Sequence, residues 1–221
     1  MAVIGVLALQ GGFAAHAAVL NALGHQTREV RVPADLAGIE GLVLPGGESS
    51  VQLKLLSEGG LEAPLVALLR SGLPALGTCA GLILLAREVY AGPARASQRS
   101  LGLLDVRVQR NAWGRQLESF EARSERGQPA LFIRAPRIEA VGPQAVVLDR
   151  FAGEPIAVRQ GNVVGACFHP ELSGGAGALH AEIFGAPRGL PSGARPHHGA
   201  CGAEARDLGA PPERLRGGRP A

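Results

Sequence analysis

Short apolar runs alternate with longer amphipathic segments along the first 90 residues of the chain. Val3–Leu9 is a continuous apolar run, and the apolar spacing over Phe13–Leu23 predicts a helix that ends at Gly24. Arg28–Val32 and Gly41–Leu44 predict further strands. Strand, helix and parallel strand make a βαβ unit, so we expect helices on both faces of a mostly parallel sheet.

The same alternation continues and then changes in character. We expect a helix over Leu61–Arg70, a strand over Leu73–Gly77 and a helix over Ala80–Glu88. Further on, strands separated by Gly/Pro turns predict an antiparallel edge that completes the sheet: Leu103–Arg110, Glu118–Arg123, Ala130–Ile133, Ala145–Asp149, Ile156–Gln160 and Val163–Phe168. The predicted fold class is therefore α/β, with three layers and an antiparallel edge.

The last 37 residues differ from the rest, since 14 of residues 185–221 are Gly or Pro and no apolar period is present. We expect residues 1–184 to form one domain and 185–221 to be a disordered Gly/Pro/Arg-rich tail. The domain holds 16 basic and 16 acidic side chains, and the tail holds 6 and 3, so the net charge of +3 belongs to the tail. This argues against a nucleic-acid-binding domain, which carries a basic patch on its folded part.

Composition excludes several other classes of protein. No apolar run approaches the roughly 18–20 residues that cross a bilayer, and the first strand has neither a basic leader nor a cleavage pattern. The three cysteines, Cys79, Cys167 and Cys201, form no CxxC pair, so we expect a reducing, cytoplasmic setting. We expect no metal site, because His197 and His198 lie with Cys201 in the tail.

Cys79 lies in Leu-Gly-Thr-Cys-Ala-Gly, between a predicted strand and a predicted helix. This layout is typical of a nucleophile elbow, in which small neighbours allow a tight turn that exposes the thiol. The N–H groups at the start of the following helix favour a thiolate and an oxyanion. The alternative is a buried structural cysteine, and the G-x-C-x-G spacing favours the nucleophile.

Two other motifs complete a candidate active site. Phe-His169-Pro-Glu171 follows the last predicted strand, where His169 could serve as a base and Glu171 could orient it. An H-x-E tripeptide alone is common, but its occurrence together with a nucleophile elbow favours a catalytic role. Leu-Pro-Gly46-Gly47-Glu48-Ser-Ser follows another strand, so its glycines can present N–H groups to negative charge while Glu48 faces the pocket. We expect one of the two serines to cap the helix that follows, and no phosphate-loop spacing is present.

With these motifs, the chain resembles the class I, Cys-His-Glu glutamine amidotransferases, whose domain is flavodoxin-like. It is more similar to the family of glutaminase subunits of pyridoxal 5′-phosphate synthase. The resemblance runs from about Ile4 to Phe184 and includes IGVLALQG, LPGGES, GTCAGLILLA and FHPEL. The triad motifs identify only the superfamily, whereas LGLLDVRVQRNAWGRQLESFEA and FIRAP narrow the resemblance to this family.

The resemblance implies that Cys79 attacks the side-chain amide of L-glutamine, that His169 moves the proton and that Glu171 orients His169. A glutamyl thioester forms, ammonia leaves and water releases glutamate. The oxyanion hole would comprise Gly46, Gly47 and the N–H of Ala80. The residues implied to bind glutamine are Gly46, Gly47, Glu48, Ser49, Arg110, Ile133 and Arg134.

The family also implies a partner, a (β/α)₈-barrel synthase subunit that receives the ammonia. Gln10 resembles the residue through which this partner activates the site, and the glutaminase would hold no cofactor of its own. An arginine fork suits an α-carboxylate, although plain surface solvation of Arg110 and Arg134 stays open.

Two alternatives remain. One is a glutaminase that serves another synthase, such as imidazole glycerol phosphate synthase, against which the family-specific blocks argue. The other is a catalytically silent binding module on the same fold, against which Cys79, His169 and Glu171 argue. The segment Leu179–Phe184, which we expect to close the domain, follows Ser-Gly-Gly-Ala-Gly and is weak helical material.

Overall fold

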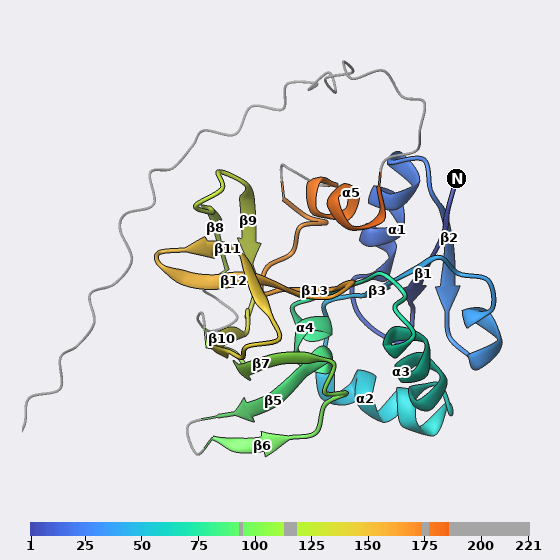
Figure 1. Cartoon of the computed structure of the whole chain (residues 1–221), viewed down its shortest axis with the longest axis horizontal. Helices are drawn as coiled ribbons and strands as arrows, with labels where there is room; N and C mark the ends of the chain where they lie inside the picture. Colours follow the sequence, from blue (N-terminus) through green and yellow to red (C-terminus); the bar gives the residue numbers. More distant parts are fainter. Residues whose placement is uncertain (93–94, 113–118, 174–176, 186–221) are drawn as a thin grey trace, which may run out of the picture. The chain divides into compact units, whose positions relative to one another are not determined.

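The computed structural model describes residues 1–92, 95–112, 119–173 and 177–185. Its centre is a seven-stranded sheet (Figure 1), with the spatial order β11 (Val146–Phe151), β12 (Glu154–Gln160), β13 (Val163–Ala166), β4 (Ala75–Thr78), β3 (Gly41–Leu44), β1 (Val3–Leu7) and β2 (Gln26–Val30). The five strands from β13 to β2 are parallel, and β11 and β12 are antiparallel. The predicted parallel sheet with an antiparallel edge is confirmed.

Helices cover both faces of this sheet. The helices α1 (Phe13–Ala22) and α5 (Ala178–Phe184) lie on one face, and α2 (Ser49–Glu58), α3 (Glu62–Arg70) and α4 (Ala80–Leu85) lie on the other (Figure 1). Side chains alternate between the two faces along each strand. In β3, Val43 packs on the face of α1 and α5, whereas Leu42 and Leu44 join the larger core on the opposite face. The three predicted layers are therefore present, and a 3₁₀ turn, Pro33–Leu36, follows β2.

The middle of the chain forms a second sheet, where the sequence predicts only an extension of the main one. This four-stranded sheet has the order β10 (Arg137–Val141), β7 (Leu104–Gln109), β5 (Ala86–Ala91) and β6 (Ala96–Gln98), and β8 (Phe120–Arg123) pairs with β9 (Pro129–Phe132). Among the described residues of this region, only those of β11, β12 and β13 join the main sheet. The strands β5, β6 and β10 carry no clear alternation of apolar and polar residues, so no local pattern predicts them.

The helix expected over Ala80–Glu88 is too long by three residues. It ends at Leu85, and the chain turns directly into β5. Ala86 pairs with Leu104 of β7, and the Leu103 N–H donates to the Leu85 carbonyl oxygen at 2.8 Å. Strand pairing with a distant segment therefore overrides the local preference for helix.

In the part of the chain that the structure describes, no helix is long and apolar enough to cross a membrane. The expected tail begins at residue 185, and residues 186–221 lie outside the described residues. The expected absence of a metal site at His197, His198 and Cys201 falls there as well.

Candidate active site

Cys79 lies at the carboxyl end of β4, in the turn that leads into α4. Its backbone has φ 47° and ψ −102°, a conformation that non-glycine residues rarely adopt. The turn is also crowded, because a Cβ atom on Gly81 would lie 2.0 Å from the carbonyl oxygen of Leu44. The thiol is buried and its Sγ lies 3.8 Å from the Ile133 carbonyl oxygen. The strand, strained turn and helix have the geometry of a nucleophile elbow.

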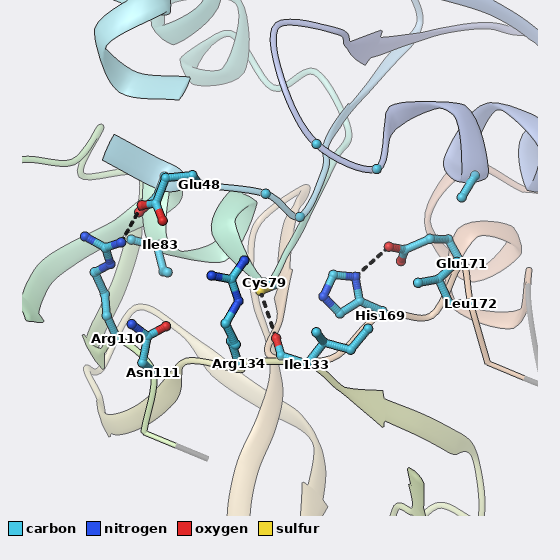
Figure 2. A pocket seen from close by; sticks show the side chains of 16 residues that line it. Glu48, Cys79, Ile83, Arg110, Asn111, Ile133, Arg134, His169, Glu171 and Leu172 are labelled. Carbon is cyan, nitrogen blue, oxygen red and sulfur yellow. Dashed lines mark hydrogen bonds and ion pairs between the residues drawn. The ribbon is translucent and has the colours of Figure 1, made fainter. Parts of the chain in front are cut away.

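His169 and Glu171 lie in the segment that follows the neighbouring strand, β13. The backbone N–H of His169 donates to the carbonyl oxygen of Leu131 at 2.9 Å, which fixes the segment against β9. The Nδ1 atom of His169 lies 2.7 Å from Oε1 of Glu171, and both side chains are buried. The ring also lies close enough to Cys79 for this residue to raise the pKa of His169. These three side chains, which come from two separate motifs, therefore meet at one edge of the sheet (Figure 2).

The electrostatics of the pair favour a charged histidine and a charged carboxylate. Burial lowers the pKa of His169, but hydrogen bonds to Cys79 and Glu171 outweigh it and raise that pKa to about 10. For Glu171 burial raises the pKa, yet the hydrogen bond from His169 and the nearby His16 outweigh it, and the net pKa is lowered. The carboxylate is thus held ionised beside the imidazole that it orients.

The Gly46-Gly47-Glu48 loop joins β3 to α2 and passes directly over His169. A Cβ atom on Gly46 would lie 2.4 Å from Cε1 of the His169 ring, so only glycine fits. The loop is anchored by Gln10, whose Oε1 accepts a hydrogen bond from the Glu48 N–H at 2.7 Å. The predicted contact of this loop with the site is present.

Glu48, and neither serine that we expected, occupies the N-cap position of α2. The Glu48 carboxylate accepts a hydrogen bond from the Ser50 hydroxyl at 2.9 Å, and its distance to the Ser50 N–H is 3.5 Å. Ser49 lies inside the helix, where its buried hydroxyl accepts a hydrogen bond from Gln98. The longer side chain of Glu48 thus caps the helix, although serine is among the residues usually preferred at this position.

Glu48 also forms an ion pair with Arg110, which follows β7 of the second sheet. The side chain of Arg110 is 16% exposed and donates a second hydrogen bond to Gln98, so it is not a solvated surface group. Burial raises the pKa of Glu48, while hydrogen bonds from Ser50 and Arg110 and the charge of Arg110 outweigh it, so the net pKa is lowered. One anionic and one cationic group therefore face each other at the same end of the cavity (Figure 2).

A cavity of about 220 Å³ connects these groups. It is smaller than the roughly 300–1,000 Å³ of drug-sized sites, which suits a ligand of amino-acid size. Of the residues predicted for the site, it is lined by Gly46, Gly47, Glu48, Ser49, Cys79, Arg110, Ile133, Arg134, His169 and Glu171. Ala80 and Gln10 do not line it. Arg134 lines the cavity from an exposed position, and its backbone has a φ of 45°.

Several residues at the site carry no sequence motif that would predict them. Three of them, Asn111, Ile83 and Leu172, line the cavity. Each lies next to or near a predicted motif, and this proximity in the sequence is the one feature that could have indicated them. His16 and His180 are missed for another reason. They lie behind Glu171, fully buried, on α1 and α5, and 164 residues separate them.

No group of three or more His, Cys, Asp or Glu side chains that could hold a metal ion is found in residues 1–92, 95–112, 119–173 and 177–185. Cys79 and Cys167 are both free thiols.

Comparison with known proteins gives the chain a family. Residues 6–183 match the model of the SNO glutamine amidotransferase family. Over 176 residues the chain is 52% identical to pyridoxal 5′-phosphate synthase subunit PdxT of Deinococcus radiodurans, covering 77% of this chain and 90% of that protein. It is 43% identical to the protein of the same name from Fervidobacterium nodosum, with the same coverage of both chains.

Solved structures agree in fold. A crystal structure of a glutamine amidotransferase matches with a TM-score of 0.75 and 41% identity, covering 82% of this chain and 96% of that one. The structure of PurLQS from Thermotoga maritima matches with a TM-score of 0.55 at 17% identity, covering 77% of this chain and 89% of that one. The second likeness concerns the fold alone.

Proposed function

The chain belongs to the SNO glutamine amidotransferase family, and from this we infer that it is the glutaminase subunit of a pyridoxal 5′-phosphate synthase. It hydrolyses L-glutamine to glutamate and ammonia for use by a synthase subunit. One observation supports this above the others: a strained Cys79 lies beside a buried His169–Glu171 pair in a cavity of amino-acid size.

In the proposed reaction, His169 already holds the proton of the Cys79 thiol, as its raised pKa favours, and Sγ of Cys79 attacks the side-chain amide carbon of glutamine. The tetrahedral intermediate collapses to a glutamyl thioester as His169 returns that proton to the leaving nitrogen, and ammonia departs. His169 then removes a proton from water, which attacks the thioester and releases glutamate and the thiol. Glu171 holds the His169 ring by its Nδ1 atom throughout, so that Nε2 faces the sulfur.

The developing negative charge on the amide oxygen needs donors near Cys79. We assign this role to the N–H of Ala80, at the start of α4, with the backbone of Gly46 and Gly47. The loop that holds these glycines is fixed to its neighbour, because the Gly12 N–H donates to the Gly46 carbonyl oxygen at 3.0 Å. Removal of one such donor typically costs about a hundredfold to a thousandfold in kcat.

Glutamine binds as a zwitterion, and the site has groups for both charges. We propose that Glu48 meets the α-amino group and Arg110 the α-carboxylate, with Ser49, Ile133 and Arg134 as further contacts. The Glu48–Arg110 ion pair supports this. When a zwitterion binds, its amino group can take the place of Arg110 beside Glu48 and its carboxylate can take the place of Glu48 beside Arg110, so no charge is left unpaired.

The proposed partner is a (β/α)₈-barrel synthase subunit that receives ammonia directly. Gln10, bonded to the Gly46–Glu48 loop, is positioned to transmit its docking to the oxyanion donors. We further propose a cytoplasmic location, which the free thiols of Cys79 and Cys167 support. The chain's own residues carry the proposed chemistry without a bound cofactor.

The test is ammonia release from glutamine, measured with and without the synthase subunit. We expect a low rate for the chain alone and a large increase on addition of the partner. Cys79→Ala should lose about 10⁴-fold or more, as other deletions of a catalytic nucleophile do.

Three results would change the assignment. Unchanged turnover by Cys79→Ala would remove the thiol from the mechanism. A rate without the synthase as high as with it would contradict a glutaminase that depends on its partner. No ammonia release under any condition would favour the catalytically silent module.

A further inference from the structure

The hydrogen bond to His169 satisfies only one of the two carboxylate oxygens of Glu171. Its Oε1 atom accepts from His169, but Oε2 has no hydrogen-bond partner among the described residues, and its side chain is 1% exposed. A buried carboxylate oxygen without a donor loses its hydration and gains nothing in return, which destabilises the folded state. The Nε2 atom of His16 lies 3.3 Å from Oε2.

His16 is itself part of a buried chain of polar groups that runs away from the cavity. Its Nε2 atom lies 3.1 Å from the Thr78 hydroxyl, and its Nδ1 atom lies 2.8 Å from Nε2 of His180. Both histidines have no exposed surface. Burial lowers the pKa of His16 to about 4 and that of His180 to about 3, so each ring is neutral near pH 7 and has one N–H.

Only two arrangements of these protons are consistent with the 2.8 Å contact between the rings. If His16 carries its proton on Nδ1, His180 must carry its own on Nδ1, which has no partner among the described residues, and a lone pair of His16 faces Glu171. If both rings carry the proton on Nε2, His180 donates to His16, and His16 donates toward Oε2 of Glu171 and the Thr78 hydroxyl. The second arrangement leaves no buried N–H unpaired and supplies the missing donor.

We propose that His16 is a positioning residue for catalysis, which holds Oε2 of Glu171 through its Nε2–H and is itself oriented by His180. The inference rests on the glutaminase activity proposed above. The donors then run in one sense, from His180 to His16 to Glu171, while His169 donates to Glu171 from the other side. This order fixes the Nδ1–H of His169 toward Glu171 and leaves Nε2 to exchange its proton with Cys79, as its role as a base requires.

A purely structural role explains these two histidines less well. Both lie where α1 and α5 cover the same face of the sheet, among apolar side chains such as Leu20, Val164 and Leu179. Two apolar residues would fill this space without the cost of burying four ring nitrogens. What the histidines add is a fixed donor behind the catalytic carboxylate.

The test compares two substitutions at His16 in the full chain, assayed for ammonia release in complex with the synthase subunit. His16→Phe keeps the ring volume and removes the donor, whereas the amide nitrogen of His16→Gln lies near the position of Nε2 and can still donate. We expect His16→Phe to lower kcat by roughly tenfold to a hundredfold, the loss seen when an outer hydrogen-bond partner of a functional group is removed. KM should change little, because His16 does not line the cavity. His16→Gln should recover most of kcat.

The pH profile distinguishes positioning from packing. The groups that face Glu171 are His169 from its own segment, His16 from α1 and His180 from α5, and Thr78 from β4 faces His16. Loss of the donor destabilises the ionised carboxylate, so the acid limb of kcat/KM should move to higher pH in His16→Phe and stay in place in His16→Gln.

His25→Phe is the matched control. This histidine is also buried and also bonds to the end of α5, through Nε2 to the Gly185 carbonyl oxygen at 2.7 Å, but it has no contact with the triad. It should lower the thermal midpoint and leave kcat and the acid limb unchanged. Equal losses of kcat in His16→Phe and His25→Phe would overturn the proposal.

The measurements distinguish failure of the glutaminase function from failure of the positioning role of His16. A wild-type complex that releases no ammonia refutes the glutaminase function, whereas an active wild type with an unchanged His16→Phe refutes only the positioning role. If His16→Phe fails to fold, the ring ¹⁵N shifts of the wild-type chain decide the matter. A neutral His16 protonated on Nε2 supports the proposal, and protonation on Nδ1 overturns it.

Discussion

Gly46 brings its loop close to His169, the proposed base. A methyl group there would lie 2.4 Å from Cε1 of His169, and the buried ring cannot swing aside as a flexible side chain would. We therefore expect Gly46→Ala to displace either the ring or the oxyanion donors. The glutaminase kcat/KM of the complex should fall by about a hundredfold or more, the scale of losing one such donor.

Gly12→Ala is the companion variant in the same cavity. Gly12 has φ −81°, and its added methyl group would find Oε1 of Glu171 at 3.8 Å, an ordinary contact. Its kcat/KM should stay within a few-fold of wild type. If Gly46→Ala were as active as Gly12→Ala, the close approach of Gly46 to His169 would not matter for activity.

Arg110 offers a different test, because its proposed role is binding and not chemistry. Truncation to alanine removes the charge-assisted bonds to the substrate carboxylate, which are worth about 1.5–3 kcal/mol, so KM for glutamine should rise by about tenfold to a hundredfold while kcat changes less. Arg107→Ala is the control, since that residue lies on β7 with a half-exposed side chain paired to Glu88. Equal effects on KM in the two variants would refute the assignment.

At the scale of elements, the sequence was most informative where strands are buried on both faces. Continuous apolar runs such as Gly41–Leu44 allowed the parallel strands to be placed to within two or three residues. The prediction failed at β5, because Ala86–Ala91 follows a helix without a break and becomes a strand only through its pairing with β7. No local pattern contains that information.

The site shows the same division between local and distant signals. Cys79 and the His169–Glu171 pair could be found because each motif places its chemistry within a few residues. His16 and His180 could not be paired, because only the packing of α1 and α5 on one face of the sheet brings them to 2.8 Å. The sequence around a histidine in an alanine-rich helix does not show whether its side chain lies at the surface, in the core or at a functional site.

The helix α5 is short, and we expect its packing to depend strongly on Phe184. That ring lies over Gly41 of β3, where a Cβ atom would approach it to 2.7 Å. Because the ring is only partly buried, Phe184→Ala should cost about 2 kcal/mol, below the 3–5 kcal/mol of a fully buried phenylalanine, and lower the thermal midpoint by roughly 4–8 °C. Val146→Ala, on an edge strand with 59% of the residue exposed, should change stability by less than about 0.5 kcal/mol. A midpoint that moves equally in both variants would contradict this account of α5.

For the whole molecule, the buried imidazoles link stability to pH in two opposite directions. His16 and His180 have pKa values lowered by burial to about 4 and about 3, so the unfolded chain binds more protons than the folded one below about pH 6.5. The pKa of His169 is raised to about 10, because its hydrogen bonds to Cys79 and Glu171 outweigh burial, so the folded chain binds more protons above about pH 6.5. The free energy of unfolding should therefore be greatest near pH 6.5.

Urea unfolding of the chain between pH 5 and 8 tests this shape, because carboxyl groups and thiols titrate mainly outside that window. From pH 6.5 to 5 two protons are involved, so the free energy of unfolding should fall with a slope that approaches about 3 kcal/mol per pH unit. From pH 6.5 to 8 only His169 contributes, and the slope should have the opposite sign and about half the size. His16→Phe removes one of the two acid-side groups and should halve the acid slope while it leaves the alkaline one. A free energy of unfolding that stays constant from pH 5 to 6.5 would show that the two buried rings are not held neutral by the fold.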